Sequence, residues 1–187
     1  MNVAITGGDW RGWRLATPGR AHPMGSRERQ AVFNTLFDVR GLRVLDLFAG
    51  GGTLGIEALS RGAESAVFVD RSRQAVATIQ ENLATIRQGV ERERMNSERT
   101  GHATGVVAQK VDEWAAEATE QFDLIFADPP YDDVQLDFLP CVARCLSRDG
   151  RFVLSIPKAM NAPEVEGLKK AAEKTYAGAK IVFYDKV

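Results

Sequence analysis

Short apolar segments alternate with amphipathic segments from residue 42 onward, and this alternation restricts the fold more than any other feature of the chain. We expect β-strands at residues 42–48, 66–69, 105–107, 122–127 and 151–156. Most of their residues are apolar, which is typical of strands buried on both faces of a parallel sheet. The alternation therefore predicts an α/β fold: a doubly wound, mostly parallel, Rossmann-like sheet.

The segments between these strands have apolar residues at the spacing of an amphipathic helix. One helix is expected after a cap at Ser72, with an apolar face formed by Val76, Ile79, Leu83 and Ile86. A second has the face Leu139, Val142, Ala143 and Leu146, and a third, capped near Ser26, is expected to bury Val32, Phe33, Leu36 and Phe37. Residues 89–104 are polar and have no periodicity, which predicts a mobile surface loop.

Two β-hairpins are expected outside the alternation. Their strands are predicted at residues 2–6 and 13–16, and at residues 174–176 and 180–184. The second hairpin would form an antiparallel edge of the main sheet. We therefore divide the chain into a small N-terminal β-hairpin extension at 1–25 and a main domain at 26–187.

The 187 residues are enough for one ordinary domain. A hydrophobic fraction of 44% and a charged fraction of 26% are typical of a soluble globular protein and exclude disordered, collagen-like and coiled-coil chains. No segment reaches the ~20 apolar residues of a membrane helix, and the first residues do not resemble a signal peptide. Cys141 and Cys145 are too few for a disulfide framework or a structural zinc site. We expect a cytoplasmic protein with no membrane partner.

Positive charge is concentrated near the N-terminus, although the net charge of the chain is only −1. Residues 1–40 have more arginines than acidic residues, whereas the rest of the chain is net acidic. An arginine-enriched end on an acidic body suits contact with a polyanion. A solvated basic face without a ligand would give the same bias.

A glycine-rich turn within residues 44–55, VLDLFAGGGTLG, is the strongest local motif. Gly50, Gly52 and Gly55 have the spacing G-x-G-x-x-G between an expected strand and a helix. Such glycines let a ligand approach the backbone, and an acidic residue at the end of the next strand, here Asp70, accepts hydrogen bonds from ribose hydroxyls. The glycines fit a dinucleotide and S-adenosylmethionine equally well.

Asp46 favours one of these ligands because it places a carboxylate near the carboxyl end of the first strand. A negative charge there repels a pyrophosphate, whereas it attracts the ammonium and sulfonium groups of S-adenosylmethionine. The alternative is a structural role, in which Asp46 caps the helix or bonds the glycine turn.

The tetrapeptide DPPY at residues 128–131 directly follows the expected strand 122–127. Two consecutive prolines end a strand and fix the backbone, which leaves carbonyl groups without competing amide donors. A carboxylate and a carbonyl can accept the two hydrogens of a planar exocyclic amine, and the aromatic ring can stack on its base. The alternative is a proline turn with a tyrosine in the core.

Together these motifs resemble those of the class I S-adenosylmethionine-dependent amino-methyltransferases, and more narrowly those of the RsmD family, which methylates the N2 amine of a guanine in bacterial small-subunit (16S) rRNA. The resemblance covers most of the chain. It is carried by Arg29 and by residues 7–12 (GGDWRG), 32–34 (VFN), 55–62 (GIEALSRG), 68–71 (FVDR), 82–83 (NL), 128–131 (DPPY), 176–178 (YAG) and 181–184 (IVFY). The chain departs from the family at residues 22–26 (HPMGS), so the family's substrate or cofactor contacts are not carried over there; it also departs at Lys110, where the family has an acid or amide near the adenine, so we expect backbone near Val111 to make that contact.

The resemblance implies S-adenosylmethionine as the cofactor and no metal. The residues expected to bind the cofactor are Asp46, Phe48, Gly50, Gly52, Asp70, Arg71 and Val111, and the expected catalytic residues are Asp128, Pro129, Pro130 and Tyr131. A guanine lifted from its stack would rest on Tyr131, with its N2 hydrogens bonded to Asp128 and to the Pro129 carbonyl. These bonds would localise the nitrogen lone pair for in-line attack on the methyl group.

The residues expected to contact RNA are Trp10, Arg11, Arg14 and Arg29. The first three lie on the N-terminal hairpin, where rings and cations suit bases and phosphates. Alternatively, the tryptophans pack the hairpin onto the main domain and the arginines are solvated. The expected partner is 16S rRNA, either free or in a partly assembled small subunit, and the protein is expected to be a monomer.

Other functions fit parts of the sequence. DNA adenine-N6 and protein glutamine methyltransferases also have an acidic or amide residue before Pro-Pro-Tyr, but the chain has no separate target-recognition domain for DNA. A NAD-dependent oxidoreductase would use the glycine turn and leave residues 128–131 unexplained. A non-catalytic RNA-binding chaperone could share the fold, but it would not need the DPPY turn.

Overall fold

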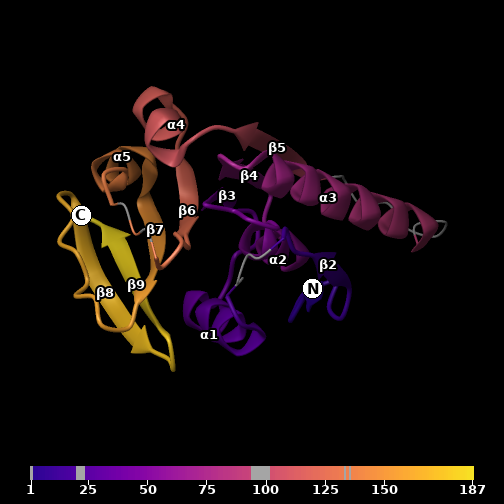
Figure 1. Cartoon of the computed structure of the whole chain (residues 1–187), viewed down its shortest axis with the longest axis horizontal. Helices are drawn as coiled ribbons and strands as arrows, with labels where there is room; N and C mark the ends of the chain where they lie inside the picture. The colour runs from indigo at the N-terminus through magenta and orange to yellow at the C-terminus, as the bar shows by residue number, and fades with distance from the viewer. Residues whose placement is uncertain (1, 20–23, 94–101, 133, 135) are drawn as a thin grey trace.

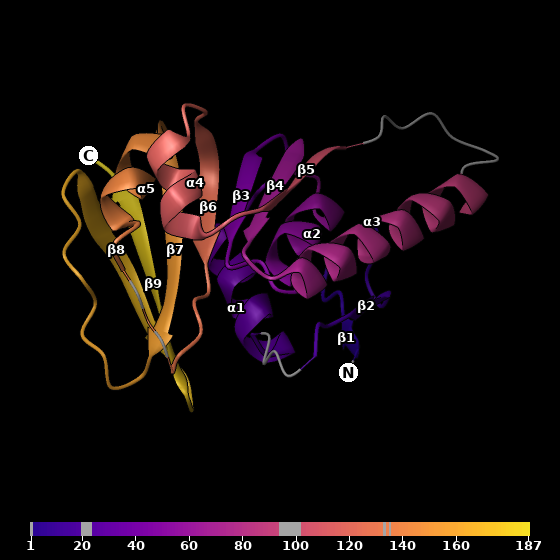
Figure 2. The same cartoon turned by 45° about the horizontal axis from the view of Figure 1, so that its top comes forward.

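The computed structural model describes residues 2–19, 24–93, 102–132, 134 and 136–187. Its main sheet has the strand order β5-β4-β3-β6-β7-β9-β8 (Figures 1 and 2). The parallel strands are β3 (Arg43–Leu47), β4 (Ser65–Asp70), β5 (Ala103–Ala108), β6 (Phe122–Ala127) and β7 (Leu146–Pro157). The antiparallel edge is the hairpin of β8 (Leu168–Thr175) and β9 (Ala179–Lys186). The predicted doubly wound α/β fold is confirmed.

Helices cover both faces of this sheet (Figure 2). On one face lie α1 (Ser26–Leu36), α2 (Thr53–Ser60) and α3 (Arg73–Glu93), and on the other lie α4 (Val111–Glu117) and α5 (Leu139–Cys145). Successive residues of a strand point to opposite faces, so Val44 joins the core beneath α2 and α3 while Leu45 joins the core beneath α4 and α5. Each face thus has its own apolar core.

The predicted N-terminal hairpin is also present, as a separate pair of strands, β1 (Asn2–Ala4) and β2 (Arg14–Ala16). It is fastened to α2 by Ser60, whose hydroxyl donates to the Gly7 carbonyl at 2.7 Å and accepts from the Trp10 amide at 2.9 Å. In both views α1 lies between this hairpin and the β8–β9 hairpin (Figures 1 and 2). Three elements therefore gather below the carboxyl ends of the parallel strands.

The loop predicted at residues 89–104 is wrong at both of its ends. Helix α3 continues to Glu93, and β5 begins at Ala103; residues 94–101 lie outside the described part of the chain. The helix continues because its last turns are packed: a Cβ atom on Gly89 would lie 2.3 Å from the Trp13 ring. That contact joins residues far apart in the sequence, so periodicity could not indicate it.

Two positions expected on buried helix faces also differ. Phe37 is 92% exposed, because α1 ends at Leu36 and the backbone turns to φ 62° at Phe37. Leu146 is buried as predicted but starts β7 instead of ending a helix. Within the described ranges, no helix is long and apolar enough to span a membrane.

Candidate active site

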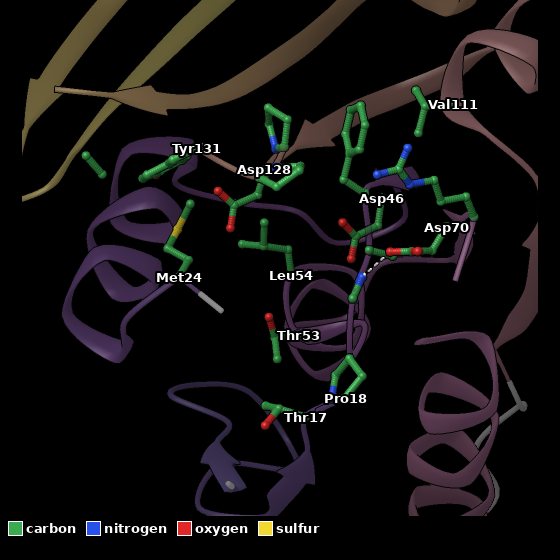
Figure 3. A pocket seen from close by; sticks show the side chains of 18 of the residues that line it. Thr17, Pro18, Met24, Asp46, Thr53, Leu54, Asp70, Val111, Asp128 and Tyr131 are labelled. Carbon is green, nitrogen blue, oxygen red and sulfur yellow. Dashed lines mark hydrogen bonds between the residues drawn. The ribbon is translucent and has the colours of Figure 1, made fainter. Parts of the chain in front are cut away.

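A cavity of about 800 Å³ opens at the carboxyl ends of β3, β4 and β6 (Figure 3). Its walls come from the glycine turn, the DPPY turn, the start of α1, the start of α4 and the tip of the β8–β9 hairpin. Acidic residues dominate the described lining, which contains Glu28, Asp46, Asp70, Asp112, Asp128, Asp132 and Asp137 but, of the basic residues, only Arg71 and Lys110. The cavity thus favours a ligand that carries positive charge.

The cavity has two distinct ends. In Figure 3, Met24 and Tyr131 lie with Asp128 on one side of Leu54, whereas Asp46 lies on the other side, with Asp70 and Val111 beyond it. The two motifs that the sequence singled out therefore converge on one cavity. An aromatic and acidic end adjoins a second acidic end of the same cavity.

The glycine turn follows β3 in a strained conformation. Phe48 has φ 56°, which is unusual for a non-glycine residue, and its ring packs against Phe138 with centroids 5.2 Å apart. Gly50 has φ 56° as well, and no atom lies within 4 Å of the Cβ position that it lacks. A ligand can therefore approach the backbone at Gly50.

Gly52 serves the fold instead of the cavity. It precedes α2 with φ 75°, and a Cβ atom there would lie 3.2–3.3 Å from Phe68, Ile56 and Ile79. Gly52 is not among the residues that line the cavity, and its contact with the cofactor stays a prediction. Gly50 lines the cavity as expected.

Asp70 lines the cavity at the end of β4 and also holds the glycine turn. Its Oδ2 accepts a hydrogen bond from the Gly50 amide at 2.9 Å, and its Oδ1 accepts one from the Ser72 amide at 2.8 Å. Carboxylate oxygens have several acceptor positions, so Asp70 retains capacity for a further donor from a ligand.

Asp46 combines the two roles that its position in the sequence allowed. It lines the cavity, and its Oδ2 accepts a hydrogen bond from the Gly55 amide at 2.9 Å. Burial raises the pKa of Asp46 well above its ordinary value, and the charges of Asp128 and Asp70 add to that effect. A cationic ligand would stabilise the ionised form of this carboxyl group.

Asp128 follows β6 directly, is half-buried and lines the cavity; burial raises its pKa to about 6 despite hydrogen bonds from Ser155 and from the Met24 backbone, which lower it. Pro129 is buried and Pro130 is exposed. Tyr131 is 41% exposed, and burial of its inner part raises its pKa to about 12. An acceptor and an aromatic ring therefore lie side by side at one end of the cavity (Figure 3).

Arg71 and Val111 both line the cavity, and Val111 lies at its far end (Figure 3); their contact with the cofactor stays a prediction. Val111 is buried at the start of α4, and Lys110 beside it also lines the wall. Within the described ranges, no group of three or more His, Cys, Asp or Glu side chains is arranged to hold a metal ion.

Two of the four residues predicted to contact RNA have buried side chains, which argues against such contacts in this conformation. Trp10 is 8% exposed and packs edge-to-face on His102, with ring centroids 5.5 Å apart. Arg29 is 1% exposed, and its guanidinium group lies inside the protein. Arg11 and Arg14 are exposed on the hairpin, so they stay available to a phosphate.

Arg29 instead connects three parts of the fold. Its guanidinium donates to the carbonyls of Met24 at 2.6 Å and Ala4 at 2.7 Å, and its Nε lies 3.7 Å from the Glu57 carboxylate. Burial lowers the pKa of Arg29, and the charge of Glu57 opposes that shift. Arg29 thereby fixes the segment before α1, where Met24 faces Asp128.

Sequence reasoning missed several residues of the cavity wall, namely Thr17, Pro18, Met24 and Glu28, and it missed Ser155, which lies behind the wall as a hydrogen-bond partner of Asp128. Thr17 and Pro18 follow the N-terminal hairpin and reach the site because Asn82 binds both the Ala16 backbone and the Gly51 carbonyl. Ser155 had one available signal: it is the polar residue within the apolar run of β7.

A comparison with protein families agrees with this geometry. The family described as "Conserved hypothetical protein 95", which is the RsmD family, matches residues 3–185. The chain belongs to the RsmD family. The match includes the N-terminal hairpin and both turns that line the cavity.

Individual relatives support this assignment. "Putative rRNA methyltransferase YlbH" of Bacillus subtilis is 35% identical over 173 residues, covering 88% of this chain and 87% of the relative. "Ribosomal RNA small subunit methyltransferase D" of Escherichia coli K12 is 33% identical over 132 residues, or 69% of this chain and 60% of that protein. The solved structure "Putative methyltransferase yhhF" from Escherichia coli superposes with a TM-score of 0.84 at 26% identity, covering 100% of this chain and 98% of the other. The fold is that of a class I methyltransferase.

Proposed function

We propose that this RsmD-family protein transfers a methyl group from S-adenosylmethionine to the N2 amine of a guanine in small-subunit (16S) rRNA. The observation that carries the proposal is the joining of two sites in one acidic cavity: a glycine turn at one end and Asp128 with Tyr131 at the other. The names of the Bacillus subtilis and Escherichia coli relatives support rRNA as the substrate class. An rRNA substrate also agrees with the expected cytoplasmic location.

The lining residues suit S-adenosylmethionine better than a nicotinamide dinucleotide. Asp46 would face the ammonium and sulfonium groups, Asp70 the ribose, and Val111 the adenine. Gly50 leaves open space against the backbone at the turn. When bound, this cofactor supplies a methyl group on a positively charged sulfur. A pyrophosphate in the same place would meet the buried carboxyl group of Asp46 and be repelled.

The acceptor end suits a base with an exocyclic amine. Tyr131 would stack on a base lifted from the RNA helix, and Asp128 and the Pro129 carbonyl would each accept one N2 hydrogen. Because N2 then donates both hydrogens, its lone pair is less delocalised into the ring and points toward the methyl group. Transfer forms the N–C bond and breaks the C–S bond. The excess proton on N2 passes to Asp128 or to water at the mouth of the cavity.

A methylation assay tests the proposal. Small subunits and naked 16S rRNA from cells that lack the protein are incubated with it and with radiolabelled S-adenosylmethionine, and the modified nucleoside is identified by mass spectrometry. We expect N2-methylguanine in 16S rRNA and none with Asp128→Asn. Methylation of adenine, or incorporation into DNA or protein but not rRNA, would reject the assignment. A titration with NADH and S-adenosylmethionine checks the cofactor, and we expect binding of the latter only.

A further inference from the structure

We propose that Ser155 is a positioning residue for methyl transfer: its buried hydroxyl joins Tyr131 to Asp128 and so holds the aromatic ring and the carboxylate in one arrangement. The inference rests on the proposed function of the DPPY turn. It concerns a residue outside that turn, on the neighbouring strand β7.

The sheet register brings Ser155 to the turn. Leu154 of β7 pairs with Ala127, the last residue of β6, so Ser155 lies level with the beginning of the DPPY turn. Leu154 and Ile156 belong to the core beneath α4 and α5, and strand alternation turns Ser155 to the opposite face. The side chain is 1% exposed there. A buried hydroxyl requires partners, and the DPPY turn supplies them.

The two hydrogen bonds of Ser155 have one consistent direction. Its Oγ lies 2.5 Å from the Tyr131 hydroxyl, and it also bonds to the Asp128 carboxylate. An ionised carboxylate can only accept, and a serine hydroxyl has a single hydrogen to donate. Ser155 therefore donates to Asp128 and accepts from Tyr131, which gives a chain from the phenol through the serine to the carboxylate.

This chain of hydrogen bonds affects both groups that are proposed to contact the base. The Tyr131 ring is partly exposed, and the bond at its hydroxyl restricts its rotation. The bond to Asp128 favours the ionised carboxylate, opposing the burial that raises its pKa to about 6. Among the described residues, the other groups that act on the pair are Asp46 on β3, the Met24 amide before α1, and Glu28 on α1, which acts on Tyr131. None of these links the ring to the carboxylate.

The test is Ser155→Ala in the full chain. We expect kcat for rRNA methylation to fall about tenfold or more, with KM for S-adenosylmethionine unchanged within about twofold. The acid limb of the kcat–pH profile should move upward by about half a pH unit or more. Carbon-13 NMR of labelled aspartates should show the same upward shift for Asp128 without any RNA. Tyr131→Phe removes the bond from its other end and should add little to the effect of Ser155→Ala in the double variant.

Matched variants separate positioning from general damage. Ser155→Thr keeps the hydroxyl, so its kcat and the position of the acid limb of its kcat–pH profile should be close to those of the wild type. Ser60→Ala removes a buried serine hydroxyl on α2, far from Asp128, and should leave the limb in place. An unchanged limb and an unchanged NMR titration in Ser155→Ala, or fully additive effects with Tyr131→Phe, would overturn the inference. Failure of the wild-type protein to methylate rRNA would instead reject the proposed function. The NMR titration would still test the hydrogen-bond chain from Tyr131 through Ser155 to Asp128.

Discussion

Buried acids occur in two regions of this molecule, and their surroundings differ. Under the N-terminal hairpin, Glu57 accepts hydrogen bonds from Thr6 and Arg61 and lies against Arg29. In the cavity, the buried Asp46 and the half-buried Asp128 have amide and hydroxyl donors, and within the described ranges neither forms an ion pair with an arginine or lysine. In the first region arginines balance the carboxylate, whereas in the second no cation of the described part of the chain balances the two carboxyl groups.

The difference separates a structural use of buried charge from a functional one. A buried ion pair that loses one partner leaves an uncompensated charge, which is strongly destabilising. A buried carboxyl group without a neighbouring cation is also uncompensated, and its pKa is raised because ionisation there is unfavourable. A cationic ligand bound in the cavity would reduce this free-energy cost of ionisation. Changing one acid at a time should therefore affect stability in one region and activity in the other.

The largest effect is expected for Asp128→Asn, which keeps the size of the side chain but removes its charge. Methyl transfer to rRNA should fall by about a thousandfold or more, because an amide accepts the N2 hydrogen less strongly. Affinity for S-adenosylmethionine, measured by calorimetry, should change less than about threefold. Asp123→Asn, at the other end of β6, is the control and should retain activity. Near-normal turnover of Asp128→Asn would contradict the functional use of this acid.

Glu57→Gln should have the largest effect on stability. It leaves the buried Arg29 without its counterion, so the free energy of unfolding in urea should fall by about 3 kcal/mol or more. Asp38→Asn breaks an exposed pair with Arg40 and should leave the urea midpoint unchanged. Equal effects of the two substitutions would show that Glu57 is not a structural charge.

Asp46→Asn should reverse the sign of the effect on stability. Because the pKa of Asp46 is raised by folding, its contribution to stability decreases as the pH rises above the unfolded value. At pH 7 the free energy of unfolding of the asparagine variant should be about 1 kcal/mol higher than that of the wild type. This difference should decrease as the pH is lowered. Affinity for S-adenosylmethionine should fall about tenfold or more. A less stable variant with normal affinity for S-adenosylmethionine would show that Asp46 has a structural role and does not bind the cofactor.

The smallest effect is expected on the exposed surface of the hairpin. Replacing Arg11 and Arg14 by alanine should weaken RNA binding severalfold and reduce its dependence on salt by one to two counterions, since each arginine is proposed to neutralise about one phosphate. Arg27→Ala, on the exposed side of α1, tests whether any cation near the cavity has the same effect. An unchanged salt slope in the double variant would leave Arg11 and Arg14 as solvated residues.

The sequence by itself determined the class of fold and the two motifs of the cavity. Apolar runs separated by helical periodicity specify a covered parallel sheet, and the ends of its parallel strands must meet at one edge. For this reason the order of residues along the chain is enough to place Asp46, Asp70 and Asp128 near one another. Both hairpins were predicted as well, because glycine between short strand patterns is a local signal.

Only the tertiary structure decided whether each remaining side chain is buried or exposed, and which partners it bonds. Arg29 belongs to the family pattern and resembles an RNA contact, yet it is an internal cation, because Glu57 and the Met24 and Ala4 carbonyls come from three separate segments. Ser155 reaches Tyr131 through the register of two strands. Local patterns report periodicity along the chain, whereas burial and hydrogen-bond partners depend on residues that are distant in sequence and meet only when the sheet forms.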